Sequence, residues 1–159
     1  MNAPTLQFPD IAELLPHRGT MLLLDRVTGF TDDAATVQAT PEAGAWYADA
    51  QGCMPAWIGL ELMAQAVGVH VGLTHHYQGL PQKAGVLLGT RSYRSAVACF
   101  PAGVPLAVHA AMAFRDPSGL GSYECTISQP GNPTNLLAEA TLKVFEPEDF
   151  HAFVQENPA

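Results

Sequence analysis

A single glutamate interrupts the longest apolar stretch of the sequence. Between Met54 and Leu73 only three side chains are clearly polar: Glu61, Gln65 and His70. Glutamate is rarely buried unless it is paired or functional, and a desolvated carboxyl group holds its proton more tightly, which suits a proton donor. Pairing with Arg18 or Arg26, or a helix face that reaches solvent, would explain Glu61 without any chemistry. Glu61 is the first candidate for acid-base catalysis.

The histidines are placed less favourably for chemistry. No histidine lies between His17 and His70, and we interpret His17, in a Leu-Pro-His-Arg turn, as structural. His70, His75 and His76 lack the spacing that puts two metal ligands on one helix face, so we predict no metal site. The sequence contains neither a serine-hydrolase elbow nor a glycine-rich phosphate loop. We therefore expect no cofactor.

The composition favours one compact domain that associates with a partner. The chain has 159 residues, of which 48% are apolar and 14% are charged, and this excludes disorder. So few surface charges are typical of a chain that hides part of its surface in an oligomer. The formal net charge of −8 argues against binding to nucleic acids and to acidic membrane surfaces.

The cysteines and the apolar stretch bear on the cellular location. Cys53, Cys99 and Cys125 are odd in number and widely spaced, so we expect three reduced thiols in a cytoplasmic protein without a signal peptide. The apolar stretch is long enough to span a membrane. Because Glu61 lies inside it and no basic residues flank it, we expect a helix buried in a soluble core and no membrane span.

The pattern along the chain predicts one domain over residues 1–159. A short N-terminal helix lies within residues 1–16, one long helix spans Pro55–His76, and residues 147–159 form a flexible acidic tail. The remaining apolar segments predict six strands: Met21–Thr31, Ala35–Thr40, Val86–Ala98, Leu106–Arg115, Gly121–Gln129 and Leu136–Phe145. Because one long apolar helix cannot bury itself, we expect an antiparallel sheet to wrap around it, in an α+β fold.

Two motifs resemble those of a known enzyme family. Residues 15–18, Leu-Pro-His-Arg, and residues 22–27, Leu-Leu-Leu-Asp-Arg-Val, resemble the opening of the 3-hydroxyacyl-acyl carrier protein dehydratases of fatty-acid synthesis. Residues 54–65 look like the central-helix motif of the same family. The resemblance covers nearly the whole chain and implies the hotdog fold of that family, in which an antiparallel sheet wraps around one long central helix.

The resemblance implies catalytic roles for three positions. In the family, a glutamate or aspartate on the central helix of one subunit works with a loop histidine of the other subunit. Glu61 matches this carboxylate, taken as the acid, and Gln65 matches the glutamine one turn later. Tyr47 stands where the histidine is expected. Because tyrosine is a poor base at neutral pH, Tyr47 either donates a hydrogen bond or fills the mouth of the pocket, and we favour filling.

The resemblance also implies a binding region at the start of the helix. Pro55, Ala56 and Trp57 match the helix start, whose free N–H groups polarise the thioester carbonyl in the family. Ala56 stands where the family usually has a glycine. Trp46 lies in the preceding loop, and because solvent loops seldom contain large aromatic pairs, we expect it in a cleft or an interface next to the substrate.

The missing histidine points to a subgroup and to partners. The pattern is similar to the dehydratase-like partner subunit of aryl polyene clusters, so the chain forms a homodimer or a heterodimer with a second hotdog dehydratase. In the heterodimer, Glu61 would complete a site whose histidine comes from the partner. The further partner is an acyl carrier protein with a phosphopantetheine-linked acyl chain. We assign its docking to Arg91 and Arg94. The alternative, that both are ordinary solvated charges on a strand, explains these residues equally well.

The sequence leaves three functions open. The first is a dehydratase with an altered site. The second is a stabilising subunit that is inactive alone. The third is a hotdog acyl-thioesterase, in which a glutamate activates water and no histidine is needed.

Overall fold

The structure, a computed structural model, describes residues 7–83 and 85–157. Its helical elements are α1 (Ile11–Leu14), a 3-10 turn at Gly19–Met21, a second at Ala56–Ile58, α2 (Gly59–Gln78) and α3 (Phe150–Glu156). Its strands are β1 (Arg26–Phe30), β2 (Ala34–Ala39), β3 (Met54–Pro55), β4 (Val86–Ser95), β5 (Cys99–Phe100), β6 (Leu106–Arg115), β7 (Leu120–Gln129) and β8 (Asn132–Phe145).

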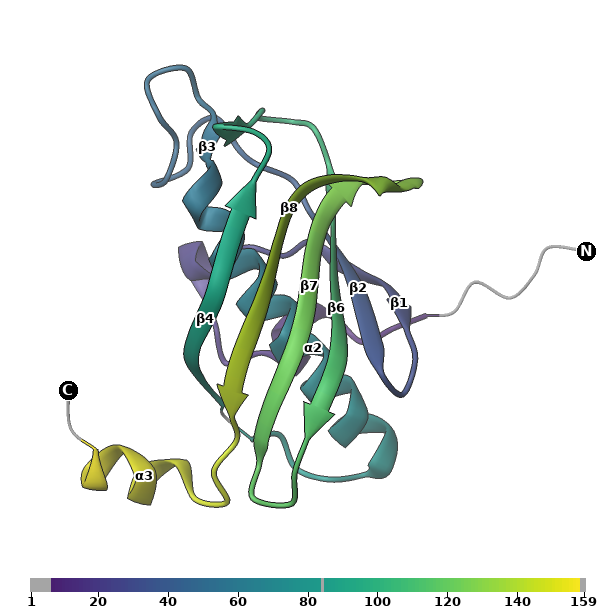
Figure 1. The fold of residues 1–159 in the computed structure, drawn as a ribbon, viewed down its shortest axis with the longest axis vertical. Helices are drawn as coiled ribbons and strands as arrows, with labels where there is room; N and C mark the ends of the chain where they lie inside the picture. Colours follow the sequence, from purple (N-terminus) through teal and green to yellow (C-terminus); the bar gives the residue numbers. More distant parts are fainter. Residues whose placement is uncertain (1–6, 84, 158–159) are drawn as a thin grey trace, which may run out of the picture.

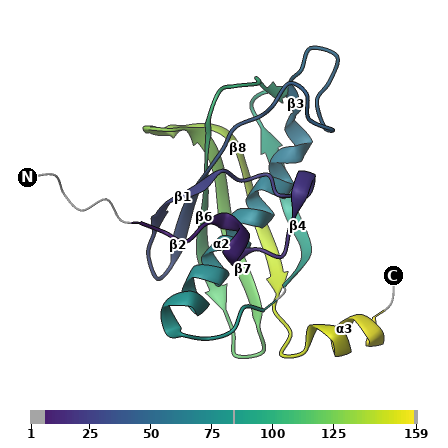
Figure 2. The ribbon, with the colours of Figure 1, turned by 180° about the vertical axis from the view of Figure 1, so that it is seen from behind.

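The long helix α2 lies along one face of a six-stranded sheet. The strand order is β1-β2-β6-β7-β8-β4, and every pair is antiparallel. Figure 1 shows the sheet curving across α2, and Figure 2 shows the N-terminal segment on the other side of the helix. A separate small ladder joins β3 to β5. This arrangement confirms the predicted α+β hotdog fold.

Helix α2 is the centre of the core. Its side chains Leu62, Met63 and Leu73 are completely buried, as are Val108 and Ile127 on the strands that face it. Burying one such side chain contributes about 1.5–3 kcal/mol, so the packing of the helix against the sheet dominates the stability of the fold. By length and composition, Ala56–Gln78 passes as a membrane span, but 61% of its most apolar window is buried inside the protein. Helix α2 has the burial of a core helix.

Glycines on α2 let the N-terminal segment pack closely against it. A Cβ on Gly68 would lie 2.7 Å from Cδ2 of Leu15, and one on Gly72 would lie 2.8 Å from the carbonyl oxygen of Leu14. Contacts this short exclude a larger residue at either position without a shift of the segment. The close approach carries the turn after Leu15, which contains His17, onto the same side of α2 as Glu61.

The two ends of the chain differ from the sequence-based expectation. Residues 1–6 of the expected helical segment lie outside the described residues, and within the described part the N-terminal helix covers only Ile11–Leu14. The segment expected as a flexible tail contains helix α3, whose first turn is capped by the Asp149 side chain. Glu146, just before this segment, is a buried anchor: its side chain is 8% exposed and lies 2.6 Å from Arg115 and 3.1 Å from His75. The spacing of apolar residues gave no sign of these partners.

The expectation of three reduced thiols is wrong. Cys53 and Cys99 form a disulfide, while Cys125 is a buried free thiol whose pKa burial raises to about 12. The two bonded cysteines are 46 residues apart in sequence, so no spacing rule reveals them. The β3–β5 ladder sets Pro55 opposite Cys99 and thereby brings Cys53 within reach. The bond ties the loop before α2 to the sheet side of the molecule.

Candidate functional site

Glu61 and Gln65 form a hydrogen-bonded pair on the first two turns of α2. The Gln65 amide nitrogen donates to Oε1 of Glu61 at 2.9 Å and to the Met21 carbonyl oxygen at 2.8 Å. The Gln65 amide oxygen accepts from the Leu23 backbone N–H at 3.1 Å. Gln65 is 1% exposed, so these contacts occur away from water. It therefore fixes the orientation of the Glu61 carboxylate and clamps the segment 21–23 onto the helix.

Glu61 is more exposed than its apolar neighbours suggested. Its side chain is 37% exposed, which fits the helix face reaching solvent that the sequence left open. The two arginines considered as partners bind elsewhere: Arg18 donates to the carbonyl oxygens of its own turn, and Arg26 donates to Gln38. The carboxylate thus faces a space that a small molecule can enter, and it is oriented by an amide and not neutralised by an arginine.

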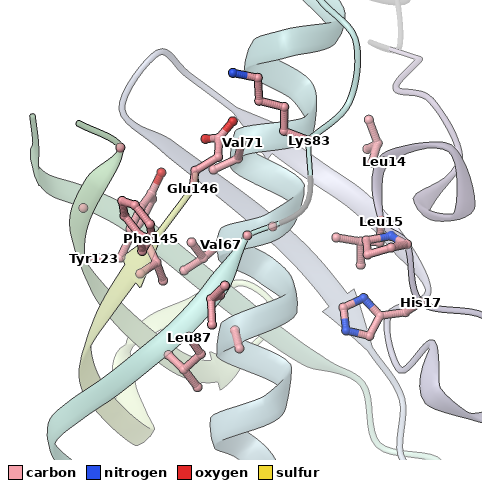
Figure 3. A pocket seen from close by; sticks show the side chains of 18 of the residues that line it. Leu14, Leu15, His17, Val67, Val71, Lys83, Leu87, Tyr123, Phe145 and Glu146 are labelled. Atoms are coloured by element: carbon pink, nitrogen blue, oxygen red, sulfur yellow. The ribbon is translucent and has the colours of Figure 1, made fainter. Parts of the chain in front are cut away.

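A pocket of about 200 Å³ opens beside Glu61. Figure 3 shows its walls, which come from the N-terminal segment, α2, the starts of β4 and β7 and the end of β8. Glu61 and His17 line it together with Val67 and Val71, which lie further along α2. At 1.5 Å per helical residue, the lining from Glu61 to Val71 extends about 15 Å. A narrow, largely apolar space of this length suits an alkyl or alkenyl chain.

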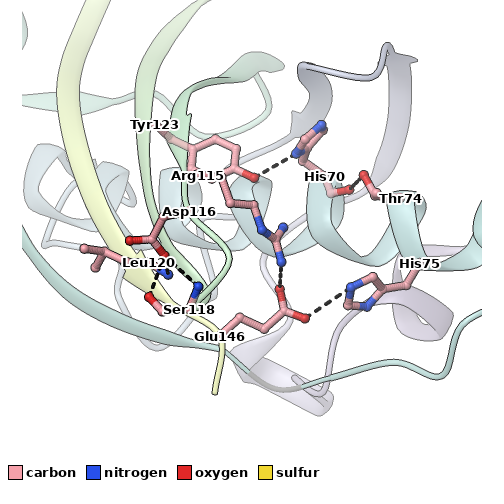
Figure 4. Close-up of polar contacts among 9 residues, drawn as sticks. All are labelled: His70, Thr74, His75, Arg115, Asp116, Ser118, Leu120, Tyr123 and Glu146. Carbon is pink, nitrogen blue, oxygen red and sulfur yellow. Dashed lines mark hydrogen bonds and ion pairs between the residues drawn. The ribbon is translucent and has the colours of Figure 1, made fainter. Parts of the chain in front are cut away.

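The other end of the pocket is polar and tightly bonded. Figure 4 shows Glu146 between Arg115 and His75, with Tyr123 bonded to His70 beside them. Burial raises the pKa of Tyr123 to about 12, so its hydroxyl keeps its proton. These contacts close the pocket opposite Glu61, although Nδ1 of His75 is buried without a partner among the described residues.

Two histidines of α2 have partners within the fold. His70 is buried and is bonded to the Tyr123 hydroxyl at 2.8 Å and to the Asp32 carbonyl oxygen at 2.9 Å. Burial lowers the pKa of His70 below its usual value. Its Nε2 donates to the carbonyl oxygen, so Nδ1 accepts from the hydroxyl. His75 contacts Glu146. Both rings therefore have structural partners.

A second group of possible ligand atoms lies beside the disulfide. Asp49, Cys53 and Cys99 bring one ligand atom each within 4.8 Å of one another. Both sulfur atoms are bonded to each other, so they offer no thiolate to a metal ion. The Asp49 carboxylate instead accepts from the backbone N–H groups of Gln51 and Cys53 at 2.9 Å each. This group is a structural turn.

Tyr47 is used inside its own loop. The side chain is 9% exposed, and its hydroxyl oxygen accepts from the Glu42 backbone N–H at 3.0 Å. Its ring meets the ring of Trp46 edge to face, with 5.5 Å between the centroids. None of the described residues that line the pocket comes from this loop. Tyr47 has the environment of a packing residue, and its role at the site remains a prediction.

The predicted substrate-binding residues lie at the start of α2, away from the pocket walls. Trp57 is 66% and Trp46 52% exposed, and the Trp46 indole N–H donates to the Thr20 carbonyl oxygen. The Ala56 backbone N–H donates to the Ala98 carbonyl oxygen, and its own carbonyl oxygen accepts from the Tyr93 hydroxyl. Pro55 is half-buried in the β3–β5 ladder. The two exposed tryptophans leave a large apolar surface at this end of the molecule.

Arg91 and Arg94 lie on β4, an edge strand of the sheet. Arg94 is 77% exposed and lies 3.0 Å from Glu139 on β8. Arg91 is exposed. Their use in carrier docking remains a prediction.

His17, which the sequence led us to interpret as structural, lies beside Glu61. Its Nε2 lies 3.5 Å from Oε1 of Glu61, and its ring lines the pocket, with 32% of the side chain exposed. The sequence pattern marked the turn that contains His17 but gave no reason to place it on α2. The contact arises from the close packing at Gly68 and Gly72, which sequence spacing does not reveal.

Comparisons with known proteins agree on one family. The model of the ApeP-like family, described as ApeP dehydratase, matches residues 9–155. The solved dehydratase heterocomplex ApeI:P from Xenorhabdus doucetiae contains a chain that is 27% identical, with a TM-score of 0.85, and the match covers 95% of this chain and 99% of that chain. None of the curated proteins matches.

Other solved structures share the fold at lower identity. The sigma28-regulated virulence protein Cj0977 from Campylobacter jejuni is 16% identical with a TM-score of 0.64, covering 87% of this chain and 96% of that one. A hypothetical thioesterase protein with coenzyme A from Streptococcus pneumoniae is 13% identical with a TM-score of 0.59, covering 76% and 84%. At these identities the likeness concerns the fold alone.

Proposed function

Because the chain belongs to the ApeP-like dehydratase family, we propose that its Glu61 site acts on 3-hydroxyacyl thioesters carried by an acyl carrier protein. The family assignment confirms the predicted resemblance to the dehydratase-like partner subunits of aryl polyene clusters. The observation that carries the proposal is the Glu61 carboxylate, held by Gln65 at one end of the apolar pocket. An acyl chain in the pocket would place its thioester end beside this carboxylate.

Dehydration needs an acid and a base at a fixed separation. The proton on C2 leaves, its electron pair forms the C2–C3 double bond, and the C3–O bond breaks. Glu61, entering in its protonated form, donates a proton to the departing hydroxyl group and releases water. The base is a second group, because Tyr47 is a poor proton acceptor and its oxygen already accepts from Glu42.

We place this chain in a heterodimer with a second hotdog dehydratase. The related chain from X. doucetiae belongs to a dehydratase heterocomplex. In the chain described here, β4 is hydrogen-bonded to β8 on one side and forms the sheet edge on the other. Leu87 and Leu88 on this strand are 39% and 52% exposed. An edge strand with exposed leucines favours pairing with another chain.

The carrier and the compartment follow from the same proposal. The negative net charge of the chain requires a local basic patch for an acidic carrier protein, and Arg91 with Arg94 supplies one beside the sheet edge. Carrier-linked acyl chains are handled in the cytoplasm, which remains the proposed location. The Cys53–Cys99 disulfide is unusual there, because cytoplasmic thiols are kept reduced.

Hydration of a trans-2-enoyl thioester, the reverse reaction, tests the proposal. The full chain is assayed alone and after mixing with a competent hotdog dehydratase encoded beside it, and complex formation is followed by size-exclusion chromatography with light scattering. We expect a stable complex whose turnover falls when this chain carries Glu61→Gln. Glu124→Gln, an exposed glutamate on β7, is the matched control and should leave the rate unchanged.

Two other outcomes would replace this function. A complex with full activity after Glu61→Gln would make the chain a stabilising subunit. Release of free thiol from the acyl thioester would make it a thioesterase.

Tyr47→Phe keeps the ring and removes the hydroxyl group that accepts from Glu42. We expect this variant to retain turnover, because the proposal gives Tyr47 no part in proton transfer.

A further inference from the structure

The proposed dehydration leaves the base unassigned, and one histidine lies where a base is needed. His17 Nε2 is 3.5 Å from Oε1 of Glu61, and both side chains line the same pocket. Each side chain is about one-third exposed, at 32% and 37%, so both are accessible to a substrate that enters. Both residues belong to one chain, whereas the sequence led us to expect the histidine from a partner.

The surroundings of His17 leave its ring open to the pocket. Its Nδ1 is buried and has no hydrogen-bond partner among the described residues. The one polar contact of the ring within the described chain is with Glu61. His75 also has a buried Nδ1 without a partner and a contact with one glutamate, but its side chain is 9% exposed and does not line the pocket, whereas His17 is 32% exposed and lines it. The environment of His17 therefore favours a chemical role over a structural one.

The neighbouring Arg18, and not His17, makes the hydrogen bonds that stabilise the turn. The Arg18 guanidinium donates from Nη1 to the carbonyl oxygens of Leu15 and His17, at 2.6 Å each. These two bonds hold the backbone that carries the imidazole. The packing of Leu15 against Gly68 fixes the same turn from the other side. The ring of His17 is thus held next to Glu61 without using its own nitrogen atoms.

We propose that His17 is the base of the Glu61 site, so that one chain supplies both the base and the acid. The inference rests on the proposed dehydration. His17 enters as the neutral tautomer with its proton on Nδ1, and Glu61 enters protonated. Nε2 then takes the proton from C2, the C2–C3 double bond forms, the C3–O bond breaks, and Glu61 donates its proton to the leaving hydroxyl group.

The contact between the two side chains also restores the starting state. After water has left, His17 carries an extra proton on Nε2 and Glu61 is a carboxylate. The proton returns from Nε2 to the Glu61 carboxylate across the same contact, directly or through one water molecule. The catalytic groups are thereby regenerated, and the overall reaction converts the 3-hydroxyacyl thioester into the enoyl thioester and water.

The test separates His17 from the loop histidine of a partner subunit. The complex is prepared with a partner in which that loop histidine is replaced by asparagine. Turnover of a trans-2-enoyl thioester and its pH profile are then measured for the wild-type chain, His17→Gln and His109→Gln. His109 is an exposed histidine on β6 that bonds to Thr36, so its variant is the matched control. Thermal melting of all three complexes checks the fold.

We expect the complex with the altered partner to turn over substrate. His17→Gln should lower kcat by about 10²- to 10⁴-fold, with KM little changed and one limb of the pH profile lost. His109→Gln should behave as the wild type. A merely structural role for His17 would lower the melting temperature without removing a limb of the pH profile, and that result would overturn the inference.

Two more outcomes are decisive. Equal turnover in wild type and His17→Gln excludes His17 as the base. Loss of all turnover on changing the partner alone assigns the base to the partner and also overturns the inference, while the proposed function stands. If the complex with an unaltered partner is itself inactive, the proposed function fails and the inference fails with it.

Discussion

The Gln65 amide reaches Glu61 from one turn further along α2, with 2.9 Å between Nε2 and Oε1. The same amide bonds to the backbone of Met21 and Leu23, so one buried side chain connects the carboxylate to the N-terminal segment. A glutamine is well suited to this position because its amide offers two donors and one acceptor together. The orientation of Glu61 thus depends on the same contacts that hold the segment before β1.

Replacement of Gln65 by leucine should therefore affect both stability and activity. The variant removes the partner of the half-buried Leu23 N–H and of the Met21 carbonyl oxygen, which should cost about 1–3 kcal/mol. Turnover should also fall, because Glu61 loses its only amide donor among the described residues. Gln78→Leu, at the exposed end of the same helix, is the control. Equal denaturation midpoints for both variants would contradict the assigned role.

The cysteine pairing gives a direct chemical prediction. Without reductant, the unfolded chain should show one reactive thiol, Cys125, and after reduction it should show three. In the native protein Cys125 should react slowly, because it is buried and its pKa is raised to about 12. Counting thiols with a colorimetric reagent decides this, and three thiols without reductant would disprove the pairing.

Removal of the disulfide should also lower stability. The double variant Cys53→Ser with Cys99→Ser opens a loop of 46 residues and should cost about 2–4 kcal/mol of unfolding free energy. Urea denaturation of the oxidised protein and of the variant measures the difference. Matching midpoints would show that the bond does not form in solution.

Sequence patterns predicted the fold better than they predicted the site. Helix α2 follows from a long apolar run and strand β6 from apolar residues at every second position, and β6 has the predicted bounds, Leu106–Arg115. Local periodicity determines such elements because each must bury one face. Contacts between distant segments depend on tertiary packing instead. The Cys53–Cys99 bond and the approach of His17 to Glu61 are both of this kind.

At Glu61, the neighbour one turn away followed from the sequence, whereas the exposure of the side chain did not. Glu61 and Gln65 lie side by side, since residues one turn apart on a helix face the same side, and the catalytic roles that the resemblance implies for them stay predictions. The sequence left the burial of Glu61 open, because its apolar neighbours in sequence point into the core while the carboxylate faces the pocket. An apolar sequence context therefore says little about the exposure of one helical side chain.

The buried His70 predicts a loss of stability in mild acid. Burial lowers the pKa of His70 in the folded protein. At pH values between this lowered pKa and the ordinary pKa of about 6.5, the unfolded chain therefore binds the proton more readily than the folded protein does. The stabilisation is complete above about pH 6.5 and is lost as the pH falls through the lowered pKa of the folded state. Urea denaturation across this range should show the decline. His70→Gln should flatten it, whereas His109→Gln, an exposed control, should not.

Charge reversal on β4 tests the predicted carrier docking. Arg91→Glu should weaken binding of an acidic carrier protein and reduce the salt dependence of the affinity, because one attraction becomes a repulsion. Arg94→Glu should weaken binding too, and it also removes the contact with Glu139, which lies 3.0 Å away. Glu139→Gln leaves Arg94 unpaired and should strengthen binding slightly if Arg94 takes part. Calorimetry at low and at high salt measures these affinities. Unchanged affinities for all three variants would show that the carrier docks elsewhere on the surface.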